Sequence, residues 1–159
     1  ITAYLGKLKG LPTIDSAIAD PEIFSVVSKA MAESGAGLVQ KHGFDPEKHR
    51  AYIQKIIGRF KNPYLQDDVT RVGREPLRKL SPTDRLVSPL TTAAGFGLPV
   101  DHLIVGMGAA LRYDNPEDAQ SVQLQQMIAQ KGVKETAREV TGISDEALLD
   151  KVVAEYEKF

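Results

Sequence analysis

The segment from Arg59 to Ser81, RFKNPYLQDDVTRVGREPLRKLS, holds the residues of this chain that are best suited to chemistry. It combines two adjacent carboxylates, Asp67 and Asp68, with a dense set of cations. Guanidinium groups form paired hydrogen bonds with carboxylates and phosphates. The segment is therefore expected to order something negative, either its own acidic side chains or a bound anion. Its cations, six of the 20 in the chain, are Arg59, Lys61, Arg71, Arg74, Arg78 and Lys79.

The spacing of these cations suits a phosphate group. Arg71, Arg74 and Arg78 share one face if the segment is helical. Lys79 lies just before Ser81-Pro82, a pair that predicts the start of a helix, and helix N-termini attract anions. Each charged hydrogen bond to a phosphate contributes about 1.5–3 kcal/mol. An anion site in this segment is therefore physically reasonable.

Other residues could complete such a site. Arg59 lies in the last turn of a predicted helix, where a cation suits the helix dipole. Asn62 and Asp68 are placed to fix the loop or to bond ligand hydroxyls. Tyr4 is not among them on its own pattern, because a tyrosine in an apolar helix more often anchors a core than binds a ligand.

Each cation also has a purely structural interpretation. Arg59 could cap the carbonyl groups of its own helix. Arg71 or Arg74 could form ion pairs with Asp67, Asp68 or Glu75. Lys61 and Arg78 are expected to be solvated. Asn62-Pro63 is expected to form a turn that ends the preceding helix.

The elements that must position these residues all have helical signals. The first eight residues, ITAYLGKL, have a helical pattern, and Leu98-Pro99 and Ser144 mark two further helix starts. Predicted helices cover about residues 1–8, 20–43, 45–61, 81–95, 98–111, 115–132 and 144–156. No segment alternates with a period of two between hairpin turns. The sequence therefore predicts an all-α fold, a compact multi-helix domain spanning 1–159. Four of its helices begin with an acceptor side chain followed by proline, at Asp20-Pro21, Asp45-Pro46, Ser81-Pro82 and Asn115-Pro116.

Two sets of residues are expected to pack inside this domain. Gly106 and Gly108 are interpreted as packing glycines that let a neighbouring helix approach. The second set is an apolar stripe that we expect in the core, formed by Tyr52, Ile53, Ile56, Ile57 and Phe60.

Composition excludes several classes of function. The 159 residues are 42% hydrophobic and 26% charged, which is typical of a globular protein. A net charge of −1 and few aromatic residues give no drive toward nucleic acid, and no apolar run is long enough to span a membrane. There are no cysteines, which excludes thiolate chemistry and fits a cytoplasmic protein. The three histidines lack metal-ligand spacing, and no G-x-G-x-x-G loop is present, so neither a metal nor a nucleotide is expected on this chain.

Three stretches carry a resemblance to a known family. They are ITAYLGK, YIQKIIGRFKNPYLQDDVTRVGREPLRKLSPTDRLVSPL and GLPVDHLIVGMGAAL. Together they resemble the C-terminal domain of the mannitol-1-phosphate 5-dehydrogenases, in the polyol-specific long-chain dehydrogenase family. The resemblance implies an N-terminal Rossmann domain that binds NAD and a helical C-terminal domain that closes over a sugar phosphate. The full-length enzyme would interconvert mannitol 1-phosphate and fructose 6-phosphate by hydride transfer.

The resemblance also implies what this chain lacks. The family's catalytic signature, K-x-x-x-x-N-x-x-H, would lie just before ITAYLGK, and no such spacing occurs here. We therefore expect a substrate domain that is inactive alone, without catalytic residues, and whose partners are its own Rossmann domain, carrying NAD, and the sugar phosphate. Neither nucleic acid nor a membrane is expected as a partner. The substrate-binding residues predicted are Tyr4, Arg59, Asn62, Asp68, Arg71, Arg74 and Lys79.

Two alternatives remain open. The chain could be a stand-alone helical module that binds phosphorylated small molecules through Arg71, Arg74 and Lys79. It could instead be a helical interaction domain that assembles through its apolar stripes.

Overall fold

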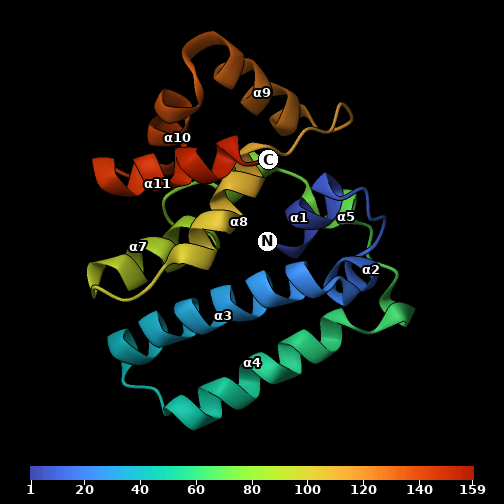
Figure 1. Cartoon of the computed structure of the whole chain (residues 1–159), viewed down its shortest axis with the longest axis vertical. Coiled ribbons are helices and arrows are strands. Elements are labelled where there is room, and N and C mark those ends of the chain that lie inside the picture. The colour runs from blue at the N-terminus through green and yellow to red at the C-terminus, as the bar shows by residue number, and fades with distance from the viewer.

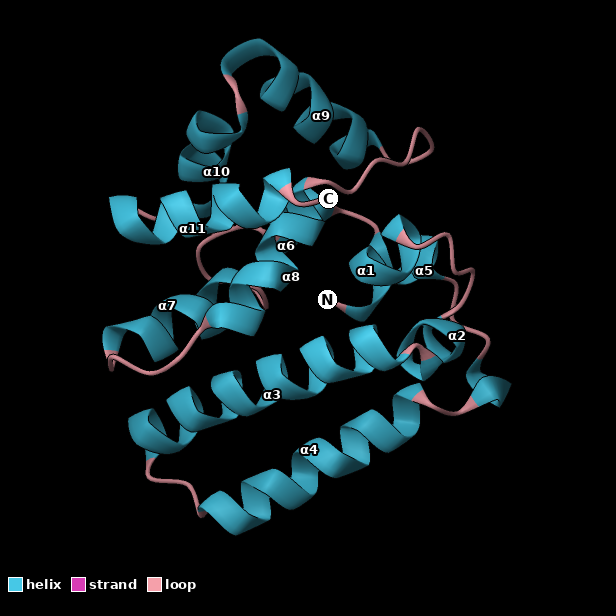
Figure 2. Ribbon diagram, viewed as in Figure 1, coloured by secondary structure: helices cyan, strands magenta, loops and turns pink.

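The computed structural model describes all residues from 1 to 159 and confirms the all-α prediction (Figure 2). Eleven α-helices and one 3-10 turn follow one another without a strand. None of the helices combines the length and hydropathy that crossing a membrane requires. The elements are α1 (Thr2–Leu8), α2 (Ile14–Ala19), α3 (Pro21–His42), α4 (Pro46–Phe60), η1 (Pro63–Leu65), α5 (Val69–Gly73), α6 (Pro76–Lys79), α7 (Val87–Gly95), α8 (Asp101–Leu111), α9 (Ala119–Lys131), α10 (Val133–Thr141) and α11 (Glu146–Glu157).

The long helices α3 and α4 form an antiparallel pair along one side of the molecule (Figure 1). Both begin as predicted, because the Asp20 and Asp45 carboxylates accept hydrogen bonds from the first free backbone N–H groups. A proline follows each cap, where its missing N–H costs nothing. The turn between them starts at Gly43, whose φ of 66° belongs to the left-handed region.

Helix α8 occupies the centre of the core and packs against α3 and α11. A Cβ on Gly106 would meet the Ile1 side chain at 2.5 Å, and one on Gly108 would meet the Tyr156 backbone nitrogen at 2.9 Å. Both glycines are therefore packing positions, as predicted. The N-terminus of α8 is capped from another helix, because Glu33 of α3 accepts from the backbone nitrogens of His102 and Leu103.

Several predicted helix starts are displaced. Ser81 makes no cap; residues 81–86 form consecutive turns, and α7 begins only at Val87. Asn115 instead closes a local turn by accepting from the Glu117 N–H, and the Asp118 carboxylate caps α9. At Asn115 the aspartate three residues further on accepts the capping hydrogen bonds, whereas α7 begins without a side-chain cap. Helix α8 begins at Asp101, three residues after its predicted start, and α11 begins at Glu146, two residues after its own. Four short helices, α2, α5, α6 and α10, were not predicted.

The apolar stripe of α4 was wrongly predicted to be core. Tyr52 is 58% exposed, and Ile57 is the only residue of the stripe that is buried. Helix α4 lies at one end of the molecule and packs mainly on α3, so the rest of its apolar face is left partly uncovered (Figure 1).

Backbone hydrogen bonds tie the loop before α5 to the loop before α2. The Ile14 N–H donates to the Asp67 carbonyl at 2.8 Å, and the Val69 N–H donates to the Pro12 carbonyl at 3.0 Å. An isolated antiparallel bridge between Thr13 and Asp68 lies between them. The start of α5 is thereby fixed beside α1 and α2.

Candidate functional site

A cavity of about 440 Å³ opens where α1, α3 and the segment from α5 to α7 meet. Nine of its 13 lining residues are hydrophobic. Its wall includes the first four residues of the chain, and its polar side chains are few. An apolar hollow with a small number of convergent polar groups is the usual form of a small-molecule site. The charged or hydroxyl-bearing side chains of the wall are Thr2, Tyr4, Asp67, Lys79 and Arg85.

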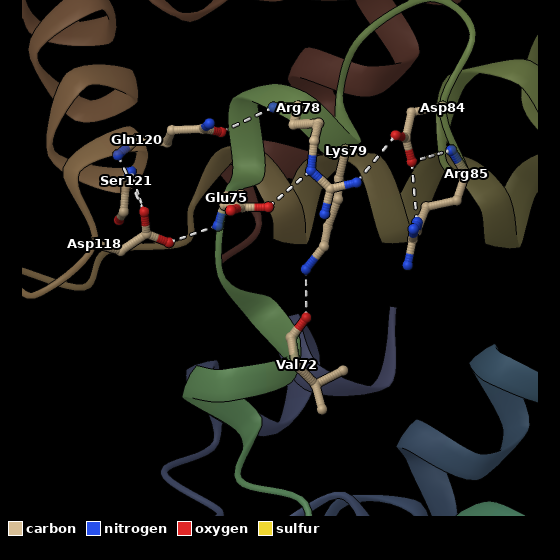
Figure 3. Close-up of polar contacts among 9 residues, drawn as sticks. All are labelled: Val72, Glu75, Arg78, Lys79, Asp84, Arg85, Asp118, Gln120 and Ser121. Carbon is tan, nitrogen blue, oxygen red and sulfur yellow. Dashed lines mark hydrogen bonds and ion pairs between the residues drawn. The ribbon is translucent and has the colours of Figure 1, made fainter.

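Lys79 supplies a buried cation to this cavity. It ends the one-turn helix α6 and is only 5% exposed. Its ammonium group donates to the Val72 carbonyl (Figure 3). The same group lies 5.8 Å from the centre of the Tyr4 ring. Burial, with the nearby Arg85 guanidinium as a second cause, lowers the pKa of Lys79 to about 8. A charged ammonium with one backbone acceptor retains capacity for a ligand oxygen.

Tyr4 contributes the second polar group. It lies on α1, is 2% exposed, and packs edge-to-face on Tyr113 with the ring centres 5.2 Å apart. Its hydroxyl is buried and has no hydrogen-bond partner. Burial raises the pKa of Tyr4, so the hydroxyl stays protonated and able to donate. An unpaired buried hydroxyl is costly, and a ligand in the cavity could satisfy it.

Arg85 also lines the cavity and was not among the predicted site residues. It lies in the turns between α6 and α7, where its Nε donates to Asp84 Oδ1 at 3.0 Å. Arg78 approaches the other oxygen of Asp84 at 3.4 Å, and Figure 3 shows this carboxylate between the two arginines. Because a helix was wrongly predicted to start at Ser81, the turn that exposes the Arg85 side chain was not predicted. The signal was nevertheless present, because the stretch LRKLSPTDRL that carries the family resemblance runs through it.

The predicted cationic face of Arg71, Arg74 and Arg78 does not form. The helix breaks between α5 and α6, where Glu75 has a φ of 58°. Arg71 and Arg74 line a separate surface hollow together with Glu75 and Asp118. Arg71 pairs with Asp67, one of the structural alternatives considered above, and the Arg74 side chain forms no ion pair or hydrogen bond.

Three predicted site residues lie outside the wall of the cavity. Arg59 is exposed at the end of α4, and its side chain makes no hydrogen bond to the helix carbonyls. Asn62 accepts from the Tyr64 N–H at 3.0 Å, which confirms the helix-stop turn. Asp68 takes part in the backbone bridge to Thr13. The structure thus brings together only Tyr4 and Lys79 of the predicted set in the cavity wall.

The remaining cations have ordinary surface environments. Lys61 is exposed, with its ammonium group 4.4 Å from the centre of the Phe24 ring. Arg78 was expected to be solvated, but its exposed side chain is held by Glu75 and Asp84.

Two arrangements that often hold a nucleotide or a metal can be compared with the structure. A dinucleotide site needs a strand followed by a glycine-rich turn and a helix, and no strand is present. No group of three or more metal-ligating side chains comes together either. The cavity itself offers a ligand an ammonium from Lys79, a guanidinium from Arg85 and the hydroxyl of Tyr4.

A comparison with protein families agrees with this architecture. The model of the mannitol dehydrogenase C-terminal domain matches residues 1–159, the whole length of the sequence. The resemblance inferred from the three stretches of sequence is confirmed at this level. The chain belongs to the family of mannitol dehydrogenase C-terminal domains and is a helical domain of a polyol dehydrogenase.

Proposed function

We propose that this chain is the substrate-binding domain of an NAD-dependent mannitol-1-phosphate 5-dehydrogenase. The full-length enzyme would interconvert mannitol 1-phosphate and fructose 6-phosphate, with NAD held by an N-terminal Rossmann domain. The family match and the cavity support this assignment. The lack of cysteine is compatible with a cytoplasmic enzyme, which is the location we propose.

One observation carries the proposal. Residues Ile1 to Tyr4 line the cavity together with Lys79 and Arg85. The family's K-x-x-x-x-N-x-x-H signature would directly precede Ile1. A chain continuing upstream would therefore bring its catalytic lysine, asparagine and histidine to the same cavity that holds these cations.

In this proposal the residues of the chain bind and orient the substrate. The Lys79 ammonium donates to substrate oxygens, and the Tyr4 hydroxyl finds in the polyol the partner that it lacks within the protein. The apolar wall, which includes Val27, Met31 and Leu86, excludes water around the carbon chain. NAD, held by the other domain, accepts the hydride. This chain alone is expected to be inactive.

The decisive experiment is expression of the full-length coding sequence. The upstream region should encode the K-x-x-x-x-N-x-x-H signature and a Rossmann glycine loop. The purified enzyme should reduce NAD when mannitol 1-phosphate is added, as followed by NADH absorbance. The product should be fructose 6-phosphate.

Two results would contradict the proposal. An upstream sequence without both motifs, or a full-length protein that does not oxidise mannitol 1-phosphate, removes the dehydrogenase assignment. Binding of mannitol 1-phosphate to residues 1–159 with the affinity of the full-length protein, measured by calorimetry, would favour a stand-alone binding module.

A further inference from the structure

Arg85 occupies a position that no other cation of the chain shares. It lines the 440 Å³ cavity and also a neighbouring hollow of about 240 Å³ between α3, α4 and α7. Ile1 and Met31 belong to both walls as well, so the two hollows meet at these three residues. Arg85 supplies the only guanidinium group in either wall.

The hydrogen bonds of Arg85 leave its outer nitrogens available. Only Nε is engaged, with Asp84 Oδ1 at 3.0 Å. Neither terminal nitrogen of the guanidinium makes a hydrogen bond, and the side chain is 65% exposed. Asp84 would remain paired if Arg85 moved, because Arg78 and the Arg85 backbone N–H also donate to it. Arg85 can therefore engage a ligand with little loss inside the protein.

The charge of a phosphate decides where it should lie. A phosphate monoester carries about two negative charges near neutral pH. Burying such an ion is expensive, and one buried ammonium does not compensate two charges. The hydroxyls of a polyol, in contrast, suit the enclosed end formed by Tyr4 and Lys79. The phosphate consequently belongs at the open rim, opposite a planar guanidinium that can contact two of its oxygens.

We propose that Arg85 binds the phosphate of the substrate at the rim of the cavity and sets the preference for phosphorylated over unphosphorylated polyols. This inference rests on the proposed function. It assigns the phosphate to a residue outside the predicted set of Arg71, Arg74 and Lys79. The polyol chain then runs from the rim toward Tyr4 and Lys79.

The two ends of this arrangement are electrostatically connected. Lys79 and Arg85 line the same cavity, so a single ligand can reach both, and the guanidinium of Arg85 contributes to the lowered pKa of Lys79. A phosphate bound at Arg85 would offset that repulsion and favour the charged form of Lys79. Binding at the rim and at the enclosed end should therefore reinforce each other.

The test compares Arg85→Gln with the unchanged full-length enzyme on mannitol 1-phosphate and on mannitol. We expect kcat/KM for mannitol 1-phosphate to fall about 10- to 100-fold, the effect of losing one charged hydrogen-bond donor. The value for mannitol should change less than threefold, and KM for NAD should stay the same. Arg85→Lys should recover part of the loss, because it retains the charge but not the paired geometry.

Arg78→Gln is the matched control. Arg78 shares the Asp84 carboxylate with Arg85 but does not line the cavity, so this variant disturbs the same ion pair without touching the rim. It should leave the ratio of the two kcat/KM values unchanged. Equal losses for both substrates in Arg85→Gln, the same change of ratio in Arg78→Gln, or a raised KM for NAD would overturn the assignment. The last result would mean that Arg85 contacts the cofactor's phosphates.

A direct binding measurement separates this inference from the proposed function. Mannitol 1-phosphate and inorganic phosphate are titrated into the full-length protein and its Arg85→Gln variant by calorimetry. Weaker binding of both to the variant supports the Arg85 assignment even if the protein does not oxidise the sugar phosphate, in which case only the proposed reaction fails. Equal binding to both proteins, or binding to neither, removes the assignment.

Discussion

Lys79 is an unusual residue because it keeps an ammonium group in a mostly apolar wall. A lysine that is 5% exposed loses most of its hydration, and a single backbone carbonyl does not replace it. The pKa of Lys79 is lowered because this lost hydration makes the charged form less stable. Structural lysines rarely stay buried without a carboxylate partner, whereas perturbed groups in hollows often serve a ligand.

The affinity of the full-length enzyme for mannitol 1-phosphate should therefore depend on pH. The charged form of Lys79 dominates below its pKa of about 8, so an anionic ligand binds best there. As the pH rises from 7 to 9.5, the ammonium loses its proton and the dissociation constant should increase severalfold. Calorimetry over this range measures the effect.

A variant separates Lys79 from other titrating groups. Lys79→Met should bind weakly and show no such step, while Lys61→Met, which removes an exposed lysine outside the cavity wall, should keep it. An unchanged step in Lys79→Met would assign the titration to another group.

The sequence located part of this site and missed part of it. It singled out Lys79 by its charge and Tyr4 through the family resemblance, and both line the cavity. It could not separate them from Arg71 and Arg74, because a break at Glu75 redirects the chain and depends on the Asp118 carboxylate 43 residues away. Arg85 was missed because Ser81-Pro82 was interpreted as a helix start. Distant contacts of this kind leave no local pattern in the sequence.

At the scale of the helices, the Asp118 carboxylate caps α9 and also binds the backbone of a distant segment. Asp118 accepts from the Gln120 and Ser121 backbone N–H groups at the start of α9. Its second oxygen accepts from the Glu75 N–H at 2.7 Å, at the break before α6 (Figure 3). This carboxylate therefore joins α9 to the segment that carries Lys79.

Asp118→Ala should destabilise the protein by more than an ordinary cap. Loss of an N-cap costs about 1 kcal/mol, and a part-buried N–H without a partner adds about 1–3 kcal/mol. We expect a total of about 2–4 kcal/mol in the free energy of unfolding, measured by urea denaturation. Asp45→Ala is the matched control, because Asp45 caps the exposed start of α4 through local backbone bonds alone. Equal losses in the two variants would show that the bond to Glu75 contributes nothing.

The pattern of capping explains which helices the sequence predicted well. An acceptor followed by proline was correct at Asp20 and Asp45, where no further Ser, Thr, Asn or Asp follows within three residues. It was misleading at Ser81 and Asn115, where an aspartate lies three residues further on. The start of α8 has no side-chain cap of its own and is completed by Glu33 of another helix, which no local signal reveals.

At the scale of the whole molecule, α8 holds the domain together. It packs on α3 along one side and on α11 along the other, so the C-terminal helices depend on it (Figure 1). The contact with α11 is close because Gly108 meets the backbone at Glu155 and Tyr156. Backbone atoms cannot rotate away as a side chain can.

Gly108→Ala should therefore destabilise the fold. A Cβ at this position would lie 2.9 Å from the Tyr156 nitrogen, and α11 must shift to admit it. We expect a loss of about 1–3 kcal/mol in the free energy of unfolding. Gly58→Ala, in the middle of α4 with no atom within 4 Å of the added Cβ, should instead stabilise by about 0.5–1 kcal/mol. Thermal unfolding of both variants measures the contrast, and a Gly108→Ala protein as stable as the parent would contradict it.

The two backbone hydrogen bonds between the loops before α2 and α5 have a consequence for how the binding wall can vary. They join Ile14 to Asp67 and Val69 to Pro12 without using a side chain. Replacing Asp67, which lines the cavity, therefore changes the charge and size of that wall but leaves the backbone hydrogen bonds in place. Only proline at 14 or 69 removes a donor. Backbone atoms hold the two loops together, while side chains set the charge and size of the wall. Side-chain substitutions can therefore alter the ligand preference of the domain without changing the position of these loops.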